Sequence, residues 1–115
     1  MKIFLDHVRG GKVVRIDVGK QLDFTAYKRF TRATLRALED PEVVAIVVDL
    51  SATHLLFDSG KAMLIDLKMR ANSLGIPLRL LNSSPEIWHK LAMVEYSKIH
   101  LNRYANVGVY SRSLR

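Results

Sequence analysis

The sequence contains no cysteine, so disulfide bonds, thiolate catalysis and cysteine-ligated metal sites are all excluded. No stretch approaches the roughly 20 consecutive apolar residues that a membrane-spanning helix needs, and we expect no membrane insertion. The first stretch, MKIFLDHVRGGK, has an acidic residue and a histidine near its start, which is unlike the apolar centre of a signal peptide. These absences are compatible with a reducing cytosol, and we expect a cytoplasmic protein.

The sequence also has little that points to catalysis or to a bound metal. Its four histidines are scattered, with no pair at i, i+4, so no metal site is expected. There is no glycine-rich phosphate loop, no nucleophile with a recognisable base and no carboxylate pair spaced for acid–base work. We therefore expect no enzyme and no cofactor. The histidines are His7, His54, His89 and His100.

The length and composition indicate one globular domain over residues 1–115, with a core over about 2–105 and a loose tail over 106–115. Apolar residues make up 49% and charged residues 25% of the chain. The net charge of +7 is compatible with nucleic acid, an acidic protein or an anionic membrane surface. Basic residues recur at helical spacing over 28–36, which favours a solvated helix face. No groove-entering motif accompanies them, and we expect no nucleic acid partner.

Short apolar runs predict the strands. Residues 2–8 and 12–18 form a hairpin with Gly10 and Gly11 at its turn. The run VVAIVVD over 43–49 is unbroken, which is typical of a central strand buried on both faces. We expect further strands over 76–82 and near 99–104.

Apolar residues spaced by three and four predict a first helix that is capped by Asp23 or Thr25 and stops before Pro41. A second helix begins at about Ser59 and ends at Gly75. A third follows Ser84, which is a plausible N-cap. The residues expected on the buried stripes are Tyr27, Phe30, Thr34 and Leu38 in the first helix, Leu64, Leu67, Ala71 and Leu74 in the second, and Ile87, Leu91 and Val94 in the third.

The resulting order, β-β-α-β-α-β-α-β, predicts an α/β fold. Its mixed sheet has an N-terminal antiparallel hairpin followed by parallel strands, and its helices lie mainly on one face.

Three segments carry a resemblance to the STAS domain family of bacterial anti-sigma-factor antagonists and sulfate-transporter tails. GKQLDFTAYKRF is similar to the family's Gly-x-Leu-Asp segment before the first helix. VVAIVVDLSATHLLFDSGKAML is similar to its buried strand and the loop that ends in Asp-Ser-Ser-Gly-x-Gly. ANSLGIPLRLLNSSPEIWHKLAMV is similar to its glycine turn, strand, Asn-x-Ser-Pro and third helix. The resemblance covers roughly residues 10 to 105 and implies a STAS-like mixed sheet.

The resemblance implies a regulatory protein–protein binding module, with an anti-sigma factor or a serine kinase or phosphatase as partner. In that family a serine at the start of the second helix is phosphorylated. Without gaps, Phe57 replaces the family's aspartate, Asp58 occupies the acceptor position and Ser59 matches the next hydroxyl residue. A one-residue shift instead makes Asp58 the family's aspartate and Ser59 the acceptor. The alternative function is a non-phosphorylated STAS subunit of a transporter-associated or stressosome-like assembly.

A helix N-terminus stabilises a nearby anion through its unpaired N–H groups, so a phosphate or a fixed carboxylate at this position has a physical basis. The plainer interpretation is an ordinary cap, in which Asp58 or Ser59 accepts a hydrogen bond from the first-turn amides. Phe57 is then either a core residue or an exposed anchor. The expected contact surface consists of Ser59 as the candidate phosphorylation site, with Asp58, Phe57, Gly60, Lys61, Met63, Asp23 and Thr25 around it.

Two further features bear on the partner. Lys61 and Lys68 lie two turns apart on the second helix, where they either flank an acidic partner surface or are simply solvated. The final stretch, ANVGVYSRSLR, lacks the apolar stripe of the family's fourth helix. Its absence would leave apolar surface open to a partner or to a second copy, so a homodimer is also considered.

Overall fold

The N-terminal hairpin forms as the glycines predict. The structure, a computed structural model, describes residues 1–81 and 83–91. Strand β1 (Lys2–Val8) pairs antiparallel with β2 (Gly11–Asp17), with Val8 opposite Gly11. Gly10 has a φ of 93°, in the left-handed region that glycine adopts without strain, which accounts for the tight turn.

The central strand lies where the unbroken apolar run predicts it. Strand β4 (Val43–Asp49) pairs in parallel with β2 on one side and with β6 (Leu78–Leu81) on the other, so the sheet order is β1-β2-β4-β6. Its residues are buried except Val44, which is 40% exposed, and Asp49 at its end, which is half-buried. Val44 lies at a register shift opposite Lys12 and Val13, where β4 carries one extra residue.

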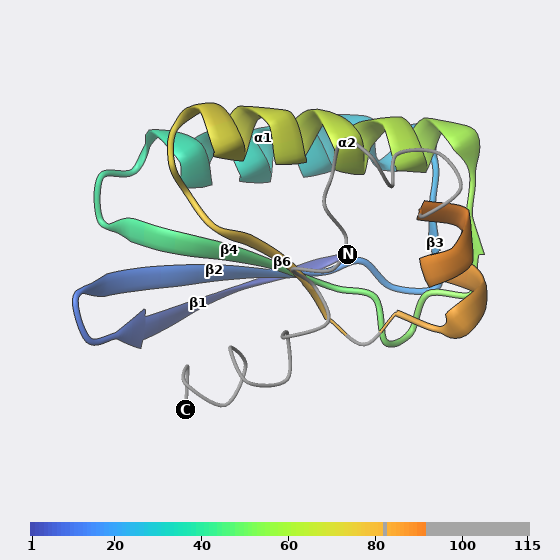
Figure 1. The fold of residues 1–115 in the computed structure, drawn as a ribbon, viewed down its shortest axis with the longest axis horizontal. Helices are drawn as coiled ribbons and strands as arrows, with labels where there is room; N and C mark the ends of the chain where they lie inside the picture. The colour runs from blue at the N-terminus through green and yellow to red at the C-terminus, as the bar shows by residue number, and fades with distance from the viewer. Residues whose placement is uncertain (82, 92–115) are drawn as a thin grey trace.

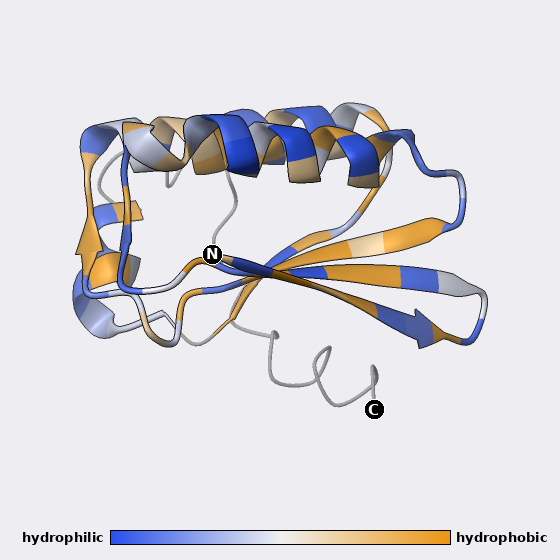
Figure 2. Cartoon of the chain, turned by 180° about the vertical axis from the view of Figure 1, so that it is seen from behind, coloured by the Kyte–Doolittle hydropathy of each residue, from blue (hydrophilic) through white to orange (hydrophobic). Residues whose placement is uncertain are grey.

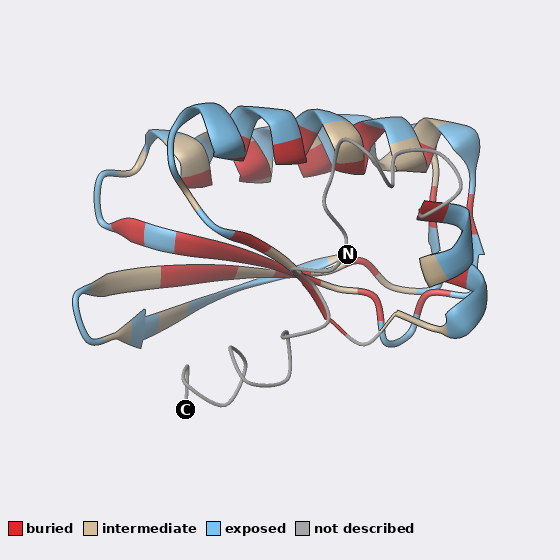
Figure 3. Ribbon diagram, in the orientation of Figure 1, coloured by how far each residue is buried: buried red, intermediate tan, exposed pale blue. Residues whose placement is uncertain are grey.

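Two helices cover one face of this sheet (Figure 1). Helix α1 (Tyr27–Glu39) ends before Pro41 as predicted and buries Phe30, Thr34 and Ala37. Helix α2 (Asp58–Ser73) buries Leu64, Leu67 and Ala71 among others. In Figure 3 the buried parts of both helices face the sheet, and in Figure 2 the polar residues lie mainly on the outer faces.

The predicted apolar stripes are wrong at their ends. Tyr27 is 57% exposed and Leu74 is 58% exposed, although the helical spacing placed both on buried stripes. Tyr27 is the first residue of α1, and Leu74 is the C-terminal cap of α2. The spacing continues to the ends of each helix, but the packing against the sheet stops earlier.

A second, very small sheet was not predicted. Strands β3 (Gln21–Leu22) and β5 (Leu55–Leu56) pair in parallel, and the 3-10 helix η1 (Phe24–Ala26) connects β3 to α1. The amide of Phe57 also donates to the carbonyl of Leu22 at 3.2 Å. These contacts bring the segments before α1 and before α2 side by side.

The third helix is described for residues 85–91. Ser84 caps it as predicted, because its Oγ accepts a hydrogen bond from the amide of Ile87 at 3.2 Å. Ile87 and Leu91 are 1% exposed and belong to the core. The predictions made for Val94, for a strand near 99–104 and for a tail over 106–115 lie outside the described residues.

Candidate functional site

The candidate site lies at the N-terminal end of α2, where Phe57 is the N-cap with an extended backbone (φ −80°, ψ 164°). The first intrahelical bond runs from the amide of Lys61 to the carbonyl of Phe57 at 2.9 Å. The expectation that Asp58 or Ser59 caps the helix is therefore wrong. The N-cap residue of α2, Phe57, makes no capping bond with its side chain. The amides of the first turn precede the intrahelical ladder and give this end a partial positive charge.

Gly60 fixes how this helix end lies on the small sheet. A Cβ at this position would lie 2.3 Å from the carbonyl oxygen of Leu22 and 2.8 Å from its carbonyl carbon. The backbone of α2 can approach β3 this closely only because residue 60 has no side chain. Gly60 is buried, so it positions the site and offers no surface to a partner.

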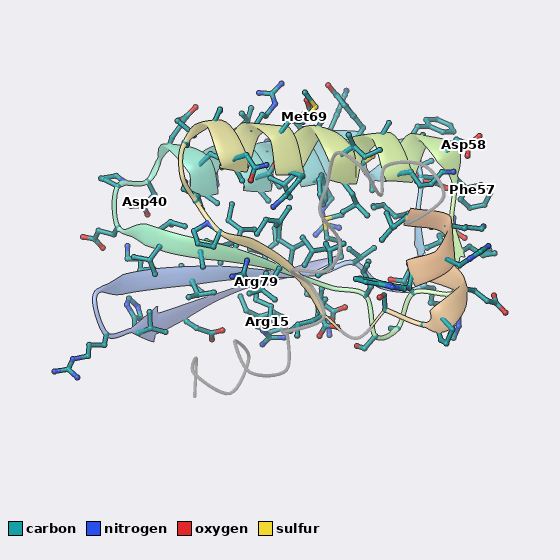
Figure 4. The ribbon with its side chains drawn as sticks, in the orientation of Figure 1. Arg15, Asp40, Phe57, Asp58, Met69 and Arg79 are labelled. Carbon is teal, nitrogen blue, oxygen red and sulfur yellow. The ribbon has the colours of Figure 1, made fainter. Side chains whose placement is uncertain are left out.

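The two residues before Gly60 differ in exposure. The side chain of Asp58 is 98% exposed, and its carboxylate lies 3.1 Å from Nζ of Lys61, whose side chain is only 17% exposed. Figure 4 places Phe57 and Asp58 together at this end of the molecule. Ser59 is half-buried. Lys68 is 5% exposed, so the interpretation of Lys68 as a simply solvated residue is wrong.

Asp23 organises the neighbouring segment rather than α1 itself. Its carboxylate accepts a hydrogen bond from the amide of Thr25 at 2.9 Å, a second bond from Oγ1 of Thr25, and one from Nε2 of Gln21 at 3.0 Å. Asp23 is the N-cap of η1, whereas α1 begins after Ala26. The prediction that Asp23 caps the entry to the first helix is thus confirmed for its 3-10 turn only.

These bonds predict a measurable pH dependence. The hydroxyl of Thr25, and then its amide, lower the pKa of Asp23 because they stabilise the carboxylate. A carboxyl with a lowered folded-state pKa contributes stability that is present above its unfolded pKa of about 3.9. That contribution is lost as pH falls through the lower folded value. In an NMR titration, Thr25→Ala should raise the pKa of Asp23; an unchanged pKa would contradict this account.

Four large apolar side chains are exposed around the start of α2. We call this set the N-terminal apolar surface. Two belong to the segment after β3, and two belong to β5 and the N-cap of α2, so the pairing of β3 with β5 brings both segments to one end of the molecule. The set comprises Phe24 (73% exposed), Tyr27 (57%), Leu55 (49%) and Phe57 (46%).

A groove of about 370 Å³ lies between α1 and α2 and opens beside this surface. Ser59 contributes to its wall, and so does Met63, which is 8% exposed. Phe24 and Tyr27 belong to both the groove and the N-terminal apolar surface. The remaining lining residues are Phe30, Thr31, Thr34, Leu35, Ala62, Asp66, Leu67 and Arg70.

The sequence predicted the polar part of this site and missed most of the apolar part. Asp58, Ser59 and Phe57 lie together at the helix start, and the Asp23 segment lies beside them, as expected. Phe24 and Leu55 were not predicted as site residues, and Tyr27 was assigned to the core. The signal that could have identified these residues as part of the site was their position close to Asp23 and Phe57 in the sequence.

Among residues 1–81 and 83–91, no group of three or more His, Asp and Glu side chains is placed to hold a metal ion. In the same residues, no helix combines the length and apolarity that crossing a bilayer requires.

Known proteins resemble this chain in sequence pattern and in fold. A family model of the STAS domain matches residues 5–109. A comparison with curated proteins found no match. Among solved structures, the anti-sigma factor antagonist SpoIIAA in its unphosphorylated form is 19% identical, with a TM-score of 0.61 over 80% of this chain and 83% of that chain.

Two other structures extend the comparison. RsbS of Moorella thermoacetica, carrying a serine-to-glutamate substitution, is 20% identical, with a TM-score of 0.63 over 81% of this chain and 77% of that chain. The murine anion transporter Slc26a9 in its inward-facing state is 15% identical, with a TM-score of 0.66; the match covers 83% of this chain and 16% of that chain. At these identities the likeness establishes a shared fold.

Proposed function

The chain belongs to the STAS domain family, and from this premise we propose that it is a cytoplasmic regulatory module that binds another protein at the start of α2. Its partner is an anti-sigma factor or a regulatory protein of the serine kinase or phosphatase type. It acts by binding and not by catalysis. The observation that carries the proposal is the exposure of Phe24, Tyr27, Leu55 and Phe57 around one helix N-terminus. Large apolar side chains exposed together are typical of protein-binding surfaces.

Negative charge at this helix end controls the binding. Ser59 has the only hydroxyl in the first turn of α2, and a phosphate there would lie near first-turn amides that favour an anion. The phosphate would add about two negative charges to a surface that is otherwise largely apolar. SpoIIAA, which shares the fold, is known in a phosphorylated form.

Asp58 offers a second route to the same control. Its carboxylate is a permanent charge at the first helical position, and Lys61 partly neutralises it at 3.1 Å. If Asp58 occupies the family's acceptor position, binding is set by this fixed charge and by the shape of the surface.

An intact-mass measurement distinguishes the two routes. After incubation with ATP and the serine kinase encoded nearest to its gene, the chain should gain the mass of one phosphate if Ser59 is the acceptor. Ser59→Ala should abolish the gain. Ser73→Ala, at the opposite end of the same helix, is the matched control and should leave the gain unchanged. A phosphate that persists in Ser59→Ala would contradict the assignment.

A second function is favoured by the likeness to Slc26a9, in which a segment of similar fold forms part of an anion transporter. In that case the chain is a non-phosphorylated subunit of a transporter-associated or stressosome-like assembly. Co-purification with a membrane fraction or a large complex, unchanged in Ser59→Ala, would support this alternative. A small complex with one soluble partner would support the leading proposal.

A further inference from the structure

The groove between α1 and α2 is an extension of the proposed binding surface along the two helices. Phe24 and Tyr27 lie at its mouth, and buried residues, including Phe30 and Leu67, form its floor. On α2 its lining runs from Ser59 to Arg70, a span of roughly 16 Å at the rise of an α-helix. The groove is therefore long enough to receive a helical segment rather than a single side chain.

The α1 side of the groove is basic. Between Asp23 and Glu39 the chain has no acidic residue but carries Lys28, Arg29, Arg32 and Arg36, all of which are exposed. Arg29 is engaged with the carbonyl oxygen of Met1 at 3.0 Å.

Two of these basic residues lie beside the groove wall. Lys28 follows the wall residue Tyr27 and Arg32 follows the wall residue Thr31, each about 100° further around α1. Lys28 and Arg32 therefore lie along the outer edge of this wall.

The charges on the α2 side do not cancel this basic edge. Asp66 and Arg70 both line the groove, and they pair with each other at 2.8 Å. Asp58, at the end of the helix, is paired with Lys61. The apolar groove thus has one strongly basic edge and one edge whose acidic groups already have cationic neighbours.

From this combination we propose that the groove binds an amphipathic helix of the partner whose flanking residues are acidic. The inference rests on the proposed function and specifies the chemistry of the partner. Helices that bind in grooves insert apolar residues at i, i+3 or i+4, and i+7, which span about 10 Å. The groove volume of about 370 Å³ is more than twice the roughly 150 Å³ of an apolar cavity that takes up benzene, so it accommodates several such side chains.

The position of Ser59 in the groove wall indicates whether a phosphate there strengthens or weakens binding of the partner helix. A phosphate on Ser59 would place negative charge at one end of the groove, where the acidic flanks of the partner helix would approach it. Like charges at an interface oppose association, so phosphorylation weakens binding of this helix.

Site-specific photo-crosslinking in cells of the source organism tests the proposal. The photoreactive residue p-benzoylphenylalanine replaces Ala62, which is exposed in the groove wall, or Phe57, on the N-terminal apolar surface. Asn72, exposed on α2 and outside the groove lining, is the matched control. Peptides attached to each position are then sequenced by mass spectrometry.

The expected result is that position 62 attaches to a peptide with apolar residues at helical spacing and Asp or Glu beside them, while position 72 does not. Attachment at position 62 to a basic peptide, to a peptide without helical spacing or to a second copy of this chain would overturn the inference. Attachment at Phe57 but not at position 62 would also overturn it and leave the proposed function standing. No attachment at either position would overturn both this inference and the proposed function.

Charge reversal provides an independent readout once the partner is purified. The double variant Lys28→Glu, Arg32→Glu should weaken partner binding about tenfold and reduce its dependence on salt. Arg9→Glu, at the exposed β1–β2 turn, makes one charge reversal away from the groove and should leave binding unchanged. If each reversed charge lowers the affinity for the partner equally in the double variant and in Arg9→Glu, only net charge matters. That result would overturn the assignment to the groove.

Discussion

Replacing Gly60 with alanine is expected to lower the free energy of unfolding by about 3 kcal/mol, the upper part of the range for overpacked sites. The new Cβ would lie 2.3 Å from the carbonyl oxygen of Leu22, and the obstruction is backbone rather than a flexible side chain. Relief requires α2 to move away from β3, which would strain the hydrogen bond between Phe57 and Leu22. Urea unfolding followed by circular dichroism measures the loss.

The glycine that follows α2 provides the control. Gly75 lies just after the helix with a φ of +71°, and a Cβ there would meet no atom within 4 Å. Gly75→Ala should therefore lower the free energy of unfolding by about 1 kcal/mol, which is the strain of alanine in this backbone conformation. If the free energy of unfolding falls equally in both variants, close packing of Gly60 on β3 is not what holds the start of α2 in place.

Phe57→Ala is expected to weaken partner binding by about 30-fold, or 2 kcal/mol, the size typical of an aromatic anchor at a binding surface. The side chain is 46% exposed, and its removal leaves the backbone bonds of Phe57 to Leu22 and Lys61 intact. The stability of the free chain should therefore change far less than the affinity. Isothermal titration with the purified partner measures the affinity, and urea unfolding measures the stability.

Leu74→Ala is the matched control for Phe57→Ala. Leu74 is 58% exposed at the opposite end of α2, so its truncation removes a comparable apolar group from the same helix away from the site. Its affinity should remain within about twofold of the wild type. Equal losses in both variants would mean that binding is not localised at the N-terminal end of α2.

The sequence was sufficient to predict the elements whose apolar pattern extends over many residues. The apolar run of β4 and the three- and four-residue spacing in α1 and α2 reflect burial over many residues, and those elements were predicted correctly. Strands β3 and β5 are two residues each, too short for any side-chain period. They are held by backbone bonds such as that between His54 and Lys20, at 2.8 Å. Such bonds leave no signature in side-chain pattern.

The site was predicted only where its residues are adjacent in sequence. Asp58 and Ser59 follow a buried strand and precede a helical period, so their position at a helix start was readable. The cap was wrong because β5 and the bond to Leu22 extend the chain through Phe57, so that the helix begins at Asp58. The groove arises from two helices that are distant in sequence, and its depth depends on packing that no local pattern records.

Amide hydrogen exchange of the chain, alone and with its co-purified partner, tests the central claim most directly. The account predicts slower exchange over residues 55–62 in the complex, where the partner covers β5 and the first turn of α2. Exchange at the β1–β2 turn, residues 9–10, should be unchanged because this turn is outside the proposed surface. Slower exchange at 9–10, with 55–62 unaffected, would contradict binding at the start of α2.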